Sequence, residues 1–340
     1  MDTAPGPSPA PTGAPVPEPR RRRSRPMAAS AVLVAVVLVV FAGVRLLGLE
    51  RGFPLVPLLA YTPYAVLVAL SAAVLTALLR RWTVTVALVL VTVALTSVVL
   101  PRALTSDPVA VEGPRVRLLT LNTHFGHTPP ENVVELVRDL RVDVLALQEV
   151  TPELVEGLSE AGLDELLPHV VDHSAPAAAG GSVHAVHPLT ALGDPGRDIG
   201  SLAMPRAAVE VPGHTAGLEV TSVHPMSPRR PSSMDAWSDG LRALPRASKT
   251  GPVQVLAGDF NATLDHAELR ALVDSGYVDV AAHRGVGLRG TWPVDGPPLP
   301  KVVLDHVLVD SRVGFGEPLV VTVEGSTHRA LFVELTLPEE

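Results

Sequence analysis

Three long apolar runs occupy the first third of the chain. They cover residues 27–49, 53–79 and 82–100. Each approaches or exceeds the roughly 20 residues that a membrane-spanning helix needs, and none shows the single apolar stripe of a helix packed on a soluble core. We therefore predict three transmembrane helices; core helices, or a cleavable signal peptide in the first run, are the alternatives. Pro54, Pro57 and Pro63 make the second helix the least regular, so its start is expected to be re-entrant or to lie later than Phe53.

A different pattern begins near residue 115, where short apolar runs alternate with segments of helical periodicity. Strands are predicted at residues 116–121, 142–147, 253–257, 302–309, 319–323 and 330–335. Helices are predicted at residues 131–141, 232–247 and 265–273. A further helix opens at Thr151, the N-cap, with Pro152 at its first position. This alternation predicts an α/β fold in which two packed sheets are flanked by helices.

Basic residues flank the apolar runs on alternate sides. Arg20 to Arg23 and Arg25 precede the first run, and Arg80 and Arg81 separate the second from the third. Because positive charge stays on the cytoplasmic side, the N-terminus is predicted inside and the chain after the third run outside. The predicted organisation is a disordered cytoplasmic tail (1–26), a three-helix membrane anchor (27–100), a linker (101–114) and a catalytic domain (115–340).

Charge and cysteine content narrow the possible chemistry. Residues 1–102 hold 10 Lys and Arg against 3 Asp and Glu, and of the totals of 27 and 35 this leaves 17 against 32, a net charge of −15, for residues 103–340. An acidic domain is not typical of proteins that bind long nucleic acids, so nucleic acid is the less expected partner. The chain has no cysteine, which excludes disulfides, thiolate metal sites and a cysteine nucleophile.

Polar side chains stand where the apolar runs of the second part end. They are Asn122, Glu149, His224, Asp259, Asn261, Asp305 and His328. One such residue is ordinary, but together these carboxylates, amides and imidazoles are what a metal-assisted phosphoester-cleaving site requires. Mg²⁺ prefers carboxylate oxygen and keeps several waters, so a single well-placed Glu can suffice. Alternate residues of an extended backbone point the same way, which would place Asp259 and Asn261 together.

These residues fall within motifs that resemble a known family. Residues 115–337 are similar to the endonuclease/exonuclease/phosphatase superfamily of magnesium-dependent phosphoesterases. Its motifs occur in family order as Leu119-Thr-Leu-Asn122, Leu147-Gln-Glu149, Ser222-Val-His224, Gly258-Asp-Phe-Asn261, Leu304-Asp-His306 and Ser326-Thr-His328. The resemblance implies a four-layered α/β sandwich and hydrolysis of phosphoric esters with Mg²⁺, or with Mn²⁺ in its place.

The resemblance also implies a role for each residue of the metal and water sites. Glu149 would bind the metal ion, and Asn122 would lie in the same metal site, where it orients Glu149 or contacts phosphate. Asp259 would orient and activate the attacking water. Asn261 would hold a phosphate oxygen.

The remaining roles concern the phosphate and the substrate. His328 would stabilise the charge that builds on the phosphate, and Asp305 would fix the tautomer of His328. His224 would assist the leaving oxygen. Trp292, in Gly290-Thr-Trp-Pro293, would touch substrate or lipid, and a purely packing role is an equal alternative.

Three positions depart from the family pattern. Thr327 stands where an Asp usually precedes the final His, His306 replaces a common aromatic residue, and His187 stands where Arg or Tyr is usual. These changes argue against nuclease-type substrates, and Thr327 implies altered metal binding.

The combined interpretation is a multi-pass membrane protein with an extracytoplasmic, Mg²⁺-dependent phosphoesterase domain. A site close to the bilayer favours a lipid-linked phosphate or pyrophosphate as substrate, and the arrangement resembles the VanJ-type membrane proteins of actinomycetes. Two alternatives stay open. One is a surface nuclease, and the other is a non-catalytic sensor or scaffold that uses a degenerate phosphoesterase domain.

Overall fold

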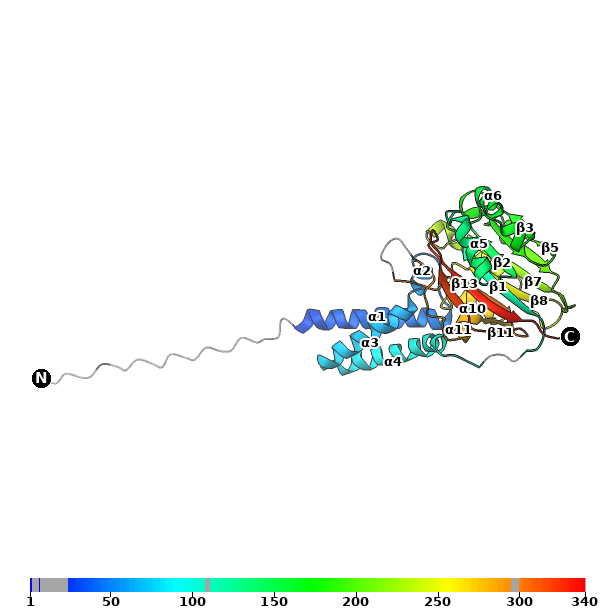
Figure 1. Ribbon diagram of the computed structural model, residues 1–340. Helices are drawn as coiled ribbons and strands as arrows, with labels where there is room; N and C mark the ends of the chain where they lie inside the picture. Colours follow the sequence, from blue (N-terminus) through cyan, green and yellow to red (C-terminus); the bar gives the residue numbers. More distant parts are fainter. Residues whose placement is uncertain (2–5, 7–23, 108–110, 295–299, 340) are drawn as a thin grey trace.

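The molecule has an apolar helical part followed by an α/β part (Figure 1). This computed structural model describes residues 1, 6, 24–107, 111–294 and 300–339. Most of the predicted N-terminal tail and residues 108–110 of the predicted linker lie outside the described residues.

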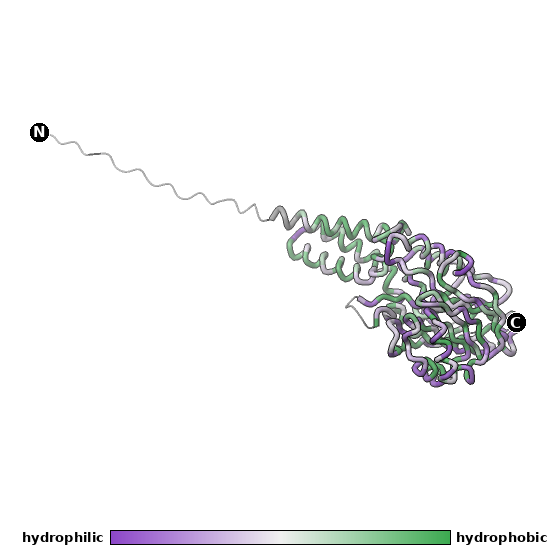
Figure 2. The backbone as a smooth tube through the Cα atoms, turned by 90° about the horizontal axis from the view of Figure 1, so that it is seen from above, coloured by the Kyte–Doolittle hydropathy of each residue, from purple (hydrophilic) through white to green (hydrophobic). Residues whose placement is uncertain are grey.

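The helical part consists of three long helices and one short one. They are α1 (Ser24–Leu47), α2 (Leu55–Leu59), α3 (Thr62–Leu78) and α4 (Trp82–Val99), and a 3-10 turn, η2 (Leu100–Ala103), follows α4. The three long helices lie side by side and share a small core that includes Leu38, Ala69 and Leu88. Their outward side chains are largely apolar and exposed, and the tube is coloured as hydrophobic along most of these helices (Figure 2).

The prediction of three full-length spanning helices is wrong for the second one. Among the described residues, two helices are long and apolar enough to cross a membrane, Ala29–Leu47 and Trp82–Ala103. The predicted span at 53–79 instead holds a turn, the short α2 and the 17-residue α3. Proline lacks an N–H and clashes with the preceding helical turn, so Pro63 is accommodated only because it lies in the first turn of α3. Both candidate spans are compatible with membrane anchoring, and the first also with a signal sequence.

Two mixed sheets build the α/β part, as predicted. The first has the order β11-β13-β1-β2-β4-β3, with β12 also paired to β13. Its strands are β1 (Arg115–Asn122), β2 (Val144–Gln148), β3 (His169–His173), β4 (Gly181–Ala185), β11 (Gly314–Phe315), β12 (Leu319–Thr322) and β13 (Arg329–Thr336). The second has the order β5-β6-β7-β8-β10-β9. Its strands are β5 (Leu189–Gly193), β6 (Arg206–Val209), β7 (Leu218–Val223), β8 (Val253–Asp259), β9 (Tyr277–Asp279) and β10 (Asp305–Asp310).

Helices cover the outer faces of both sheets (Figure 1). On the first sheet they are α5 (Pro130–Asp139), α6 (Pro152–Glu160) and α7 (Leu163–Leu166), and on the second α9 (Met234–Ala243) and α10 (Ala267–Val273). Short helices α8 (Pro195–Asp198) and α11 (Val280–His283) and 3-10 turns η3 (Ala177–Ala179) and η4 (Pro231–Ser233) complete the fold. The predicted N-cap is confirmed, because the Thr151 hydroxyl accepts a hydrogen bond from Leu154 N at 3.2 Å.

The strand order brings the polar ends of several strands to one edge. β1 and β2 are parallel and end at Asn122 and Gln148, and β7 and β8 are parallel and end at Val223 and Asp259. β10 runs antiparallel to β8, so its first residue, Asp305, lies opposite Asp259. The strand predicted at residues 302–309 therefore begins three residues later in the structure, at Asp305.

Candidate active site

Six polar residues from six strands and their loops meet at this edge. Asn122, Glu149, His224, Asp259, Asp305 and His328 are connected by polar contacts of 3.9 Å or less. All are buried except Glu149, whose side chain is 12% exposed. The residues proposed from the sequence therefore lie in one cluster.

Asn122 connects the two sheets at the centre of the cluster. Its side-chain amide donates to Glu149 Oε1 and to Asp259 Oδ2, both at 3.1 Å. Its amide oxygen accepts from the His124 backbone N–H at 2.9 Å, which fixes the orientation of the amide. Two acidic side chains that are distant in the sequence are thus held around one donor.

The backbone that follows β8 is built around a glycine. Gly258 has a φ of 154°, and a Cβ there would lie 2.2 Å from the Val223 carbonyl oxygen, so only glycine fits where β7 and β8 approach each other. Asn261 has a φ of 47°, so the extended backbone expected between Asp259 and Asn261 is not found. The two residues still meet, because Asp259 Oδ1 accepts from Asn261 N at 2.8 Å.

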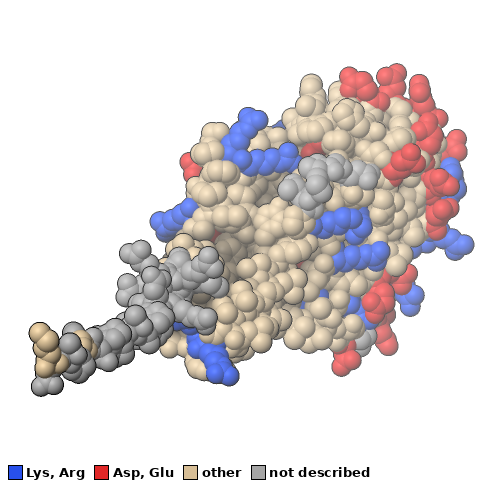
Figure 3. Space-filling view, turned by 90° about the vertical axis from the view of Figure 1, so that its left-hand side faces the viewer, with Lys and Arg blue, Asp and Glu red and all other residues tan. Residues whose placement is uncertain are grey.

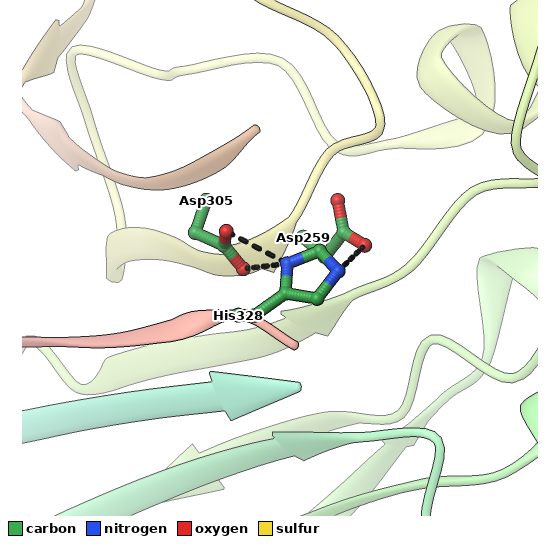
Figure 4. A group of neighbouring side chains, drawn as sticks. All are labelled: Asp259, Asp305 and His328. Carbon is green, nitrogen blue, oxygen red and sulfur yellow. Dashed lines mark hydrogen bonds and ion pairs between the residues drawn. The ribbon is translucent and has the colours of Figure 1, made fainter. Parts of the chain in front are cut away.

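The His328 ring lies between two carboxylates (Figure 4). Its Nδ1 donates to Asp305 Oδ2 at 2.9 Å, and its Nε2 lies 3.6 Å from Asp259 Oδ2. Burial alone lowers the pKa of His328, but the charges of Asp305 and Asp259 outweigh it and raise that pKa to about 9. The ring is therefore an imidazolium at neutral pH, with Nε2 directed away from Asp305.

Asp259, the carboxylate beside His328, is buried as well. Desolvation raises the pKa of Asp259, and the attraction of His328 only partly opposes this. The Asp259 side chain keeps two donors, Asn122 and the backbone of Asn261. A buried acid whose proton affinity is raised while its oxygens stay oriented is suited to positioning a water molecule.

His224 lies close to both of the acids that Asn122 binds. Its Nε2 is 3.6 Å from Glu149 Oε1 and 3.9 Å from Asp259 Oδ2. Its Nδ1 is buried and has no hydrogen-bond partner among the described residues. Trp292 borders the cluster, with its ring centroid 6.4 Å from that of His328.

Two sets of side chains in the cluster could hold a cation. Asp259, Asp305 and His328 offer ligand atoms within 4.8 Å of one another, but Asp305 and His328 already bind each other and a protonated imidazole is no ligand. Glu149 and Asp259 instead offer hard carboxylate oxygens on the two sides of Asn122. The residues around Glu149 therefore fit a hard divalent cation better.

Comparison with known proteins agrees with this geometry. The sequence pattern of the endonuclease/exonuclease/phosphatase family matches residues 119–328, which is more than half of the chain. The chain belongs to this family. Among curated protein sequences, none matches.

Solved structures share the family fold. A humanized form of D. rerio TDP2 with 14 mutations is 14% identical, covers 65% of this chain and 99% of its own, and has a TM-score of 0.52. D. rerio TDP2 complexed with a single-strand DNA product is 15% identical over the same shares, with a TM-score of 0.51. A functionally unknown conserved protein from Enterococcus faecalis V583 is 15% identical, again over 65% and 99%, with a TM-score of 0.50. At these identities the likeness concerns the fold alone.

Several residues that hold this family site in place were not identified from the sequence. Thr291 Oγ1 accepts from the backbone N–H groups of Leu304 and Asp305, at 3.0 and 3.2 Å, and so fixes the start of β10. Gln148 donates to Ser222 Oγ at 2.9 Å across the two sheets. Each of these residues stands within a quoted motif, but the local pattern does not show its role, because its partners are distant in the sequence.

Ser326 has a positioning role of the same kind. Its Oγ donates to the Asn122 carbonyl at 2.7 Å and accepts from His328 N at 2.9 Å. This residue was noted only as part of a motif. In the structure it joins the loop after β1 to the loop before β13.

The structure shows the burial and the contacts of the three residues that depart from the family pattern. Thr327 is half-buried, and its carbonyl accepts from Val294 N at 2.9 Å. His306 is buried and bonds Asp279 at 2.6 Å, where burial lowers the pKa of His306 but Asp279 raises it above its usual value. His187 is half-buried at the end of the segment after β4.

Proposed function

We propose that this protein is a metal-dependent phosphoester hydrolase that works at the outer surface of a membrane. The observation that carries the proposal is the convergence of Glu149, Asp259 and the His328–Asp305 pair in one buried cluster. Membership of a family whose domains generally cleave phosphoesters supports it. The assignment of residues to roles is part of the proposal.

In this proposal the reaction is an in-line attack of water on phosphorus. Asp259 orients the water with one carboxylate oxygen and accepts its proton as the bond from phosphorus to the leaving oxygen breaks, while Asn122 and the Asn261 backbone hold that carboxylate in place. His328 donates from Nε2 to a phosphoryl oxygen and stabilises the charge that develops there, with Asp305 keeping the ring protonated. His224 lies on the opposite side, near Glu149, where it can assist the leaving oxygen.

A divalent cation, Mg²⁺ or Mn²⁺, would be held by Glu149 with Asn122 in its immediate surroundings. Bound there, the ion would supply electrophilic assistance to the phosphoryl group. Glu149 is prepared for this role, because its Oε2 accepts from Phe125 N at 2.7 Å and its Oε1 from Asn122. Trp292, next to His328, would contact the substrate.

Membrane anchoring is likewise proposed: α1 and α4 are the helices of spanning length, and the 17-residue α3, shorter than the predicted second span, would cross between them. The end of α1, the start of α3 and the end of α4 lie at the α/β part, whereas the loop with Arg80 and Arg81 lies at the far end (Figure 1). α3 is about 26 Å long and α4 about 27 Å, a little under the hydrocarbon thickness of about 30 Å. With the basic residues cytoplasmic, three crossings would place the α/β part outside the cell membrane.

A lipid-linked phosphate or pyrophosphate is the substrate class that this placement favours. This substrate class agrees with the net negative charge of residues 103–340, which disfavours binding of a long polyanion. The relation to VanJ-type proteins stays a prediction.

Nuclease activity is the second candidate. A protein of the same fold, D. rerio TDP2, has been solved with a single-strand DNA product, so the fold accepts nucleic acid.

The test is a hydrolysis assay on the full-length protein in nanodiscs with Mg²⁺. We expect phosphate release from farnesyl pyrophosphate and no cleavage of plasmid DNA. Asp259→Asn and His328→Gln should each lower kcat by about a hundredfold or more, the scale typical of groups that act on the transition state. Asp239→Asn, at an exposed acid on α9, is the matched control and should keep the wild-type rate.

Cleavage of DNA in place of the pyrophosphate would transfer the assignment to the nuclease. Rates in Asp259→Asn and His328→Gln equal to the wild type on every substrate would refute the catalytic assignment and favour a scaffold.

A further inference from the structure

The cavity next to the catalytic cluster is built from two parts of the chain. It has a volume of about 430 Å³, within the range of small-molecule sites. His328 and Asn261 lie at its catalytic end. Another part of its wall comes from the segment between α1 and α3, through Phe53, Pro57 and Tyr61. We call residues 48–61 the anchor loop.

The anchor loop is held on the α/β part by buried contacts along its length. Val56 is 3% exposed and belongs to the same core as Trp237 and Phe260. The Val56 carbonyl accepts from His266 Nε2 at 2.9 Å, and Thr263 N donates to the other nitrogen of that ring. Burial lowers the pKa of His266, so the ring is neutral and its single proton lies on Nε2. The α2 wall is therefore part of the folded structure.

The end of α1 and the turn after α4 are both fixed to the same buried carboxylate of the α/β part. Arg45 at the end of α1 and Arg102 after α4 both bind the buried carboxylate of Asp265, at 2.6 and 2.7 Å. Tyr64, in the first turn of α3, donates to the Lys301 carbonyl at 2.8 Å. Because these contacts surround the anchor loop, its position over the cavity is determined by the domain itself.

The chemistry of the cavity changes from one end to the other. The catalytic end offers His328 and Asn261, which suit a phosphoryl group. The anchor-loop wall is apolar, and Phe53 in it remains 50% exposed. A phosphoester with a hydrocarbon chain complements both ends, whereas a wholly polar ester leaves the anchor-loop wall unmatched.

We infer that the anchor loop is a substrate-binding wall that selects phosphoesters carrying a long hydrocarbon chain, with Phe53 and Ala60 as specificity-determining residues. The inference rests on the proposed function and adds that the membrane anchor itself completes the site. The chain lies along α2 while its phosphate reaches His328. A substrate can then approach from the bilayer without leaving it completely.

The test compares two pyrophosphates that share a head group and differ in chain length. Full-length protein in nanodiscs is assayed with farnesyl pyrophosphate and with the shorter dimethylallyl pyrophosphate. For Phe53→Ala we expect the ratio of kcat/KM, farnesyl over dimethylallyl, to fall about tenfold, the effect of losing much of one buried aromatic contact. The loss should appear in KM for farnesyl pyrophosphate and not in kcat.

A second variant and a matched control keep the test independent of folding. Ala60→Trp, which fills the cavity from the anchor loop, should lower the same ratio. Leu58→Ala is the control, because Leu58 belongs to α2 but is 49% exposed and does not line the cavity; it should keep the wild-type ratio.

The outcomes separate this inference from the function on which it rests. If the wild type hydrolyses both pyrophosphates and Phe53→Ala and Ala60→Trp keep its ratio, the anchor loop does not select the chain and the inference is wrong. If the wild type hydrolyses neither, the proposed function fails and the inference fails with it.

Discussion

Two residues of the candidate site have a backbone conformation that their side chains rarely adopt. Glu149 has a φ of 58° and Asn261 a φ of 47°, in the left-handed region that costs a non-glycine residue energy. Contacts compensate at Asn261, since its side chain donates to the Pro225 carbonyl and its carbonyl accepts from Trp237 Nε1, both at 3.0 Å. Both strained positions lie directly after strands, Glu149 after β2 and Asn261 after β8, where the polar side chains of the candidate site are placed.

A buried histidine outside the site gives the protein a pH dependence of its own. Burial lowers the pKa of His184 to about 4, and its only hydrogen bond among the described residues is to Ser182, at 2.9 Å. The unfolded chain takes up this proton near pH 6.5 and the folded protein only near pH 4, so stability falls as pH decreases through that window.

We therefore predict that His184→Gln reduces the loss of unfolding free energy between pH 6.5 and pH 4 by about 3 kcal/mol. Chemical denaturation in detergent micelles, repeated at several pH values, would measure it. Between pH 7 and 8, the difference in unfolding free energy between variant and wild type should stay constant. Equal acid sensitivity of the two proteins would contradict the buried neutral state.

At the scale of elements, α10 and the loop before it connect the apolar helices to the α/β part. Asp265 accepts from Arg45 and twice from Arg102. Burial alone would raise the pKa of Asp265, but hydrogen bonds and charge from the two arginines lower it. Glu50 of the anchor loop also accepts from Ala267 N, at the first turn of α10. Arg45 and Arg102 thus share one buried ionic contact with Asp265, which is at least 163 residues away from either arginine.

Asp265→Asn should weaken the docking of the anchor by about 3–5 kcal/mol, because two buried arginines lose their counter-charge. The expected result is faster proteolysis between the helices and the domain, measured by limited digestion in micelles. Asp274→Asn, at the exposed C-cap of α10, is the matched control and should digest like the wild type.

The triple variant Arg45→Met, Arg102→Met, Asp265→Leu should recover much of the lost resistance, because it removes all three charges together. If Asp265→Asn digests no faster than Asp274→Asn, the ion pairs do not hold the anchor in place.

At the scale of the whole molecule, charge and hydropathy divide along one axis. The helices expose apolar side chains such as Val37, Val40 and Leu90, and the tube is hydrophobic there (Figure 2). Seen from the side toward which the helices extend, Lys and Arg surround an uncharged surface, and Asp and Glu gather along one edge (Figure 3). A basic rim around apolar helices suits contact with anionic lipid head groups.

The proposed topology predicts the location of the C-terminus. A reporter that is active only outside the cytoplasmic membrane, fused after Glu340, should be active, and the same reporter inserted between Arg80 and Arg81 should be silent. The reverse pattern would invert the orientation. Activity at neither position would show that the domain lies inside.

The sequence predicted most elements of the α/β part because their signals are local. The apolar run of β2 and the helical spacing of α5 follow from neighbouring residues alone, and Thr151 caps α6 for the same reason. The motif order identified the family, which the match at residues 119–328 confirms. The second apolar run was predicted as too long a span, because its prolines indicated an irregular start but not the residue at which the helix begins.

What the sequence determined by itself is therefore the set of elements, the apolar helices and the chemical identity of the candidate site residues, since each depends on a residue and its near neighbours. Tertiary structure alone decided that Asp305 opens β10 opposite Asp259, that Asn122 holds two acids from different sheets, and that the anchor loop forms a wall of the cavity. These features join positions separated by as many as 275 residues, as in the cavity shared by Phe53 and His328. Such contacts form only when the sheets pack and the anchor docks, and no periodicity along the chain encodes that packing.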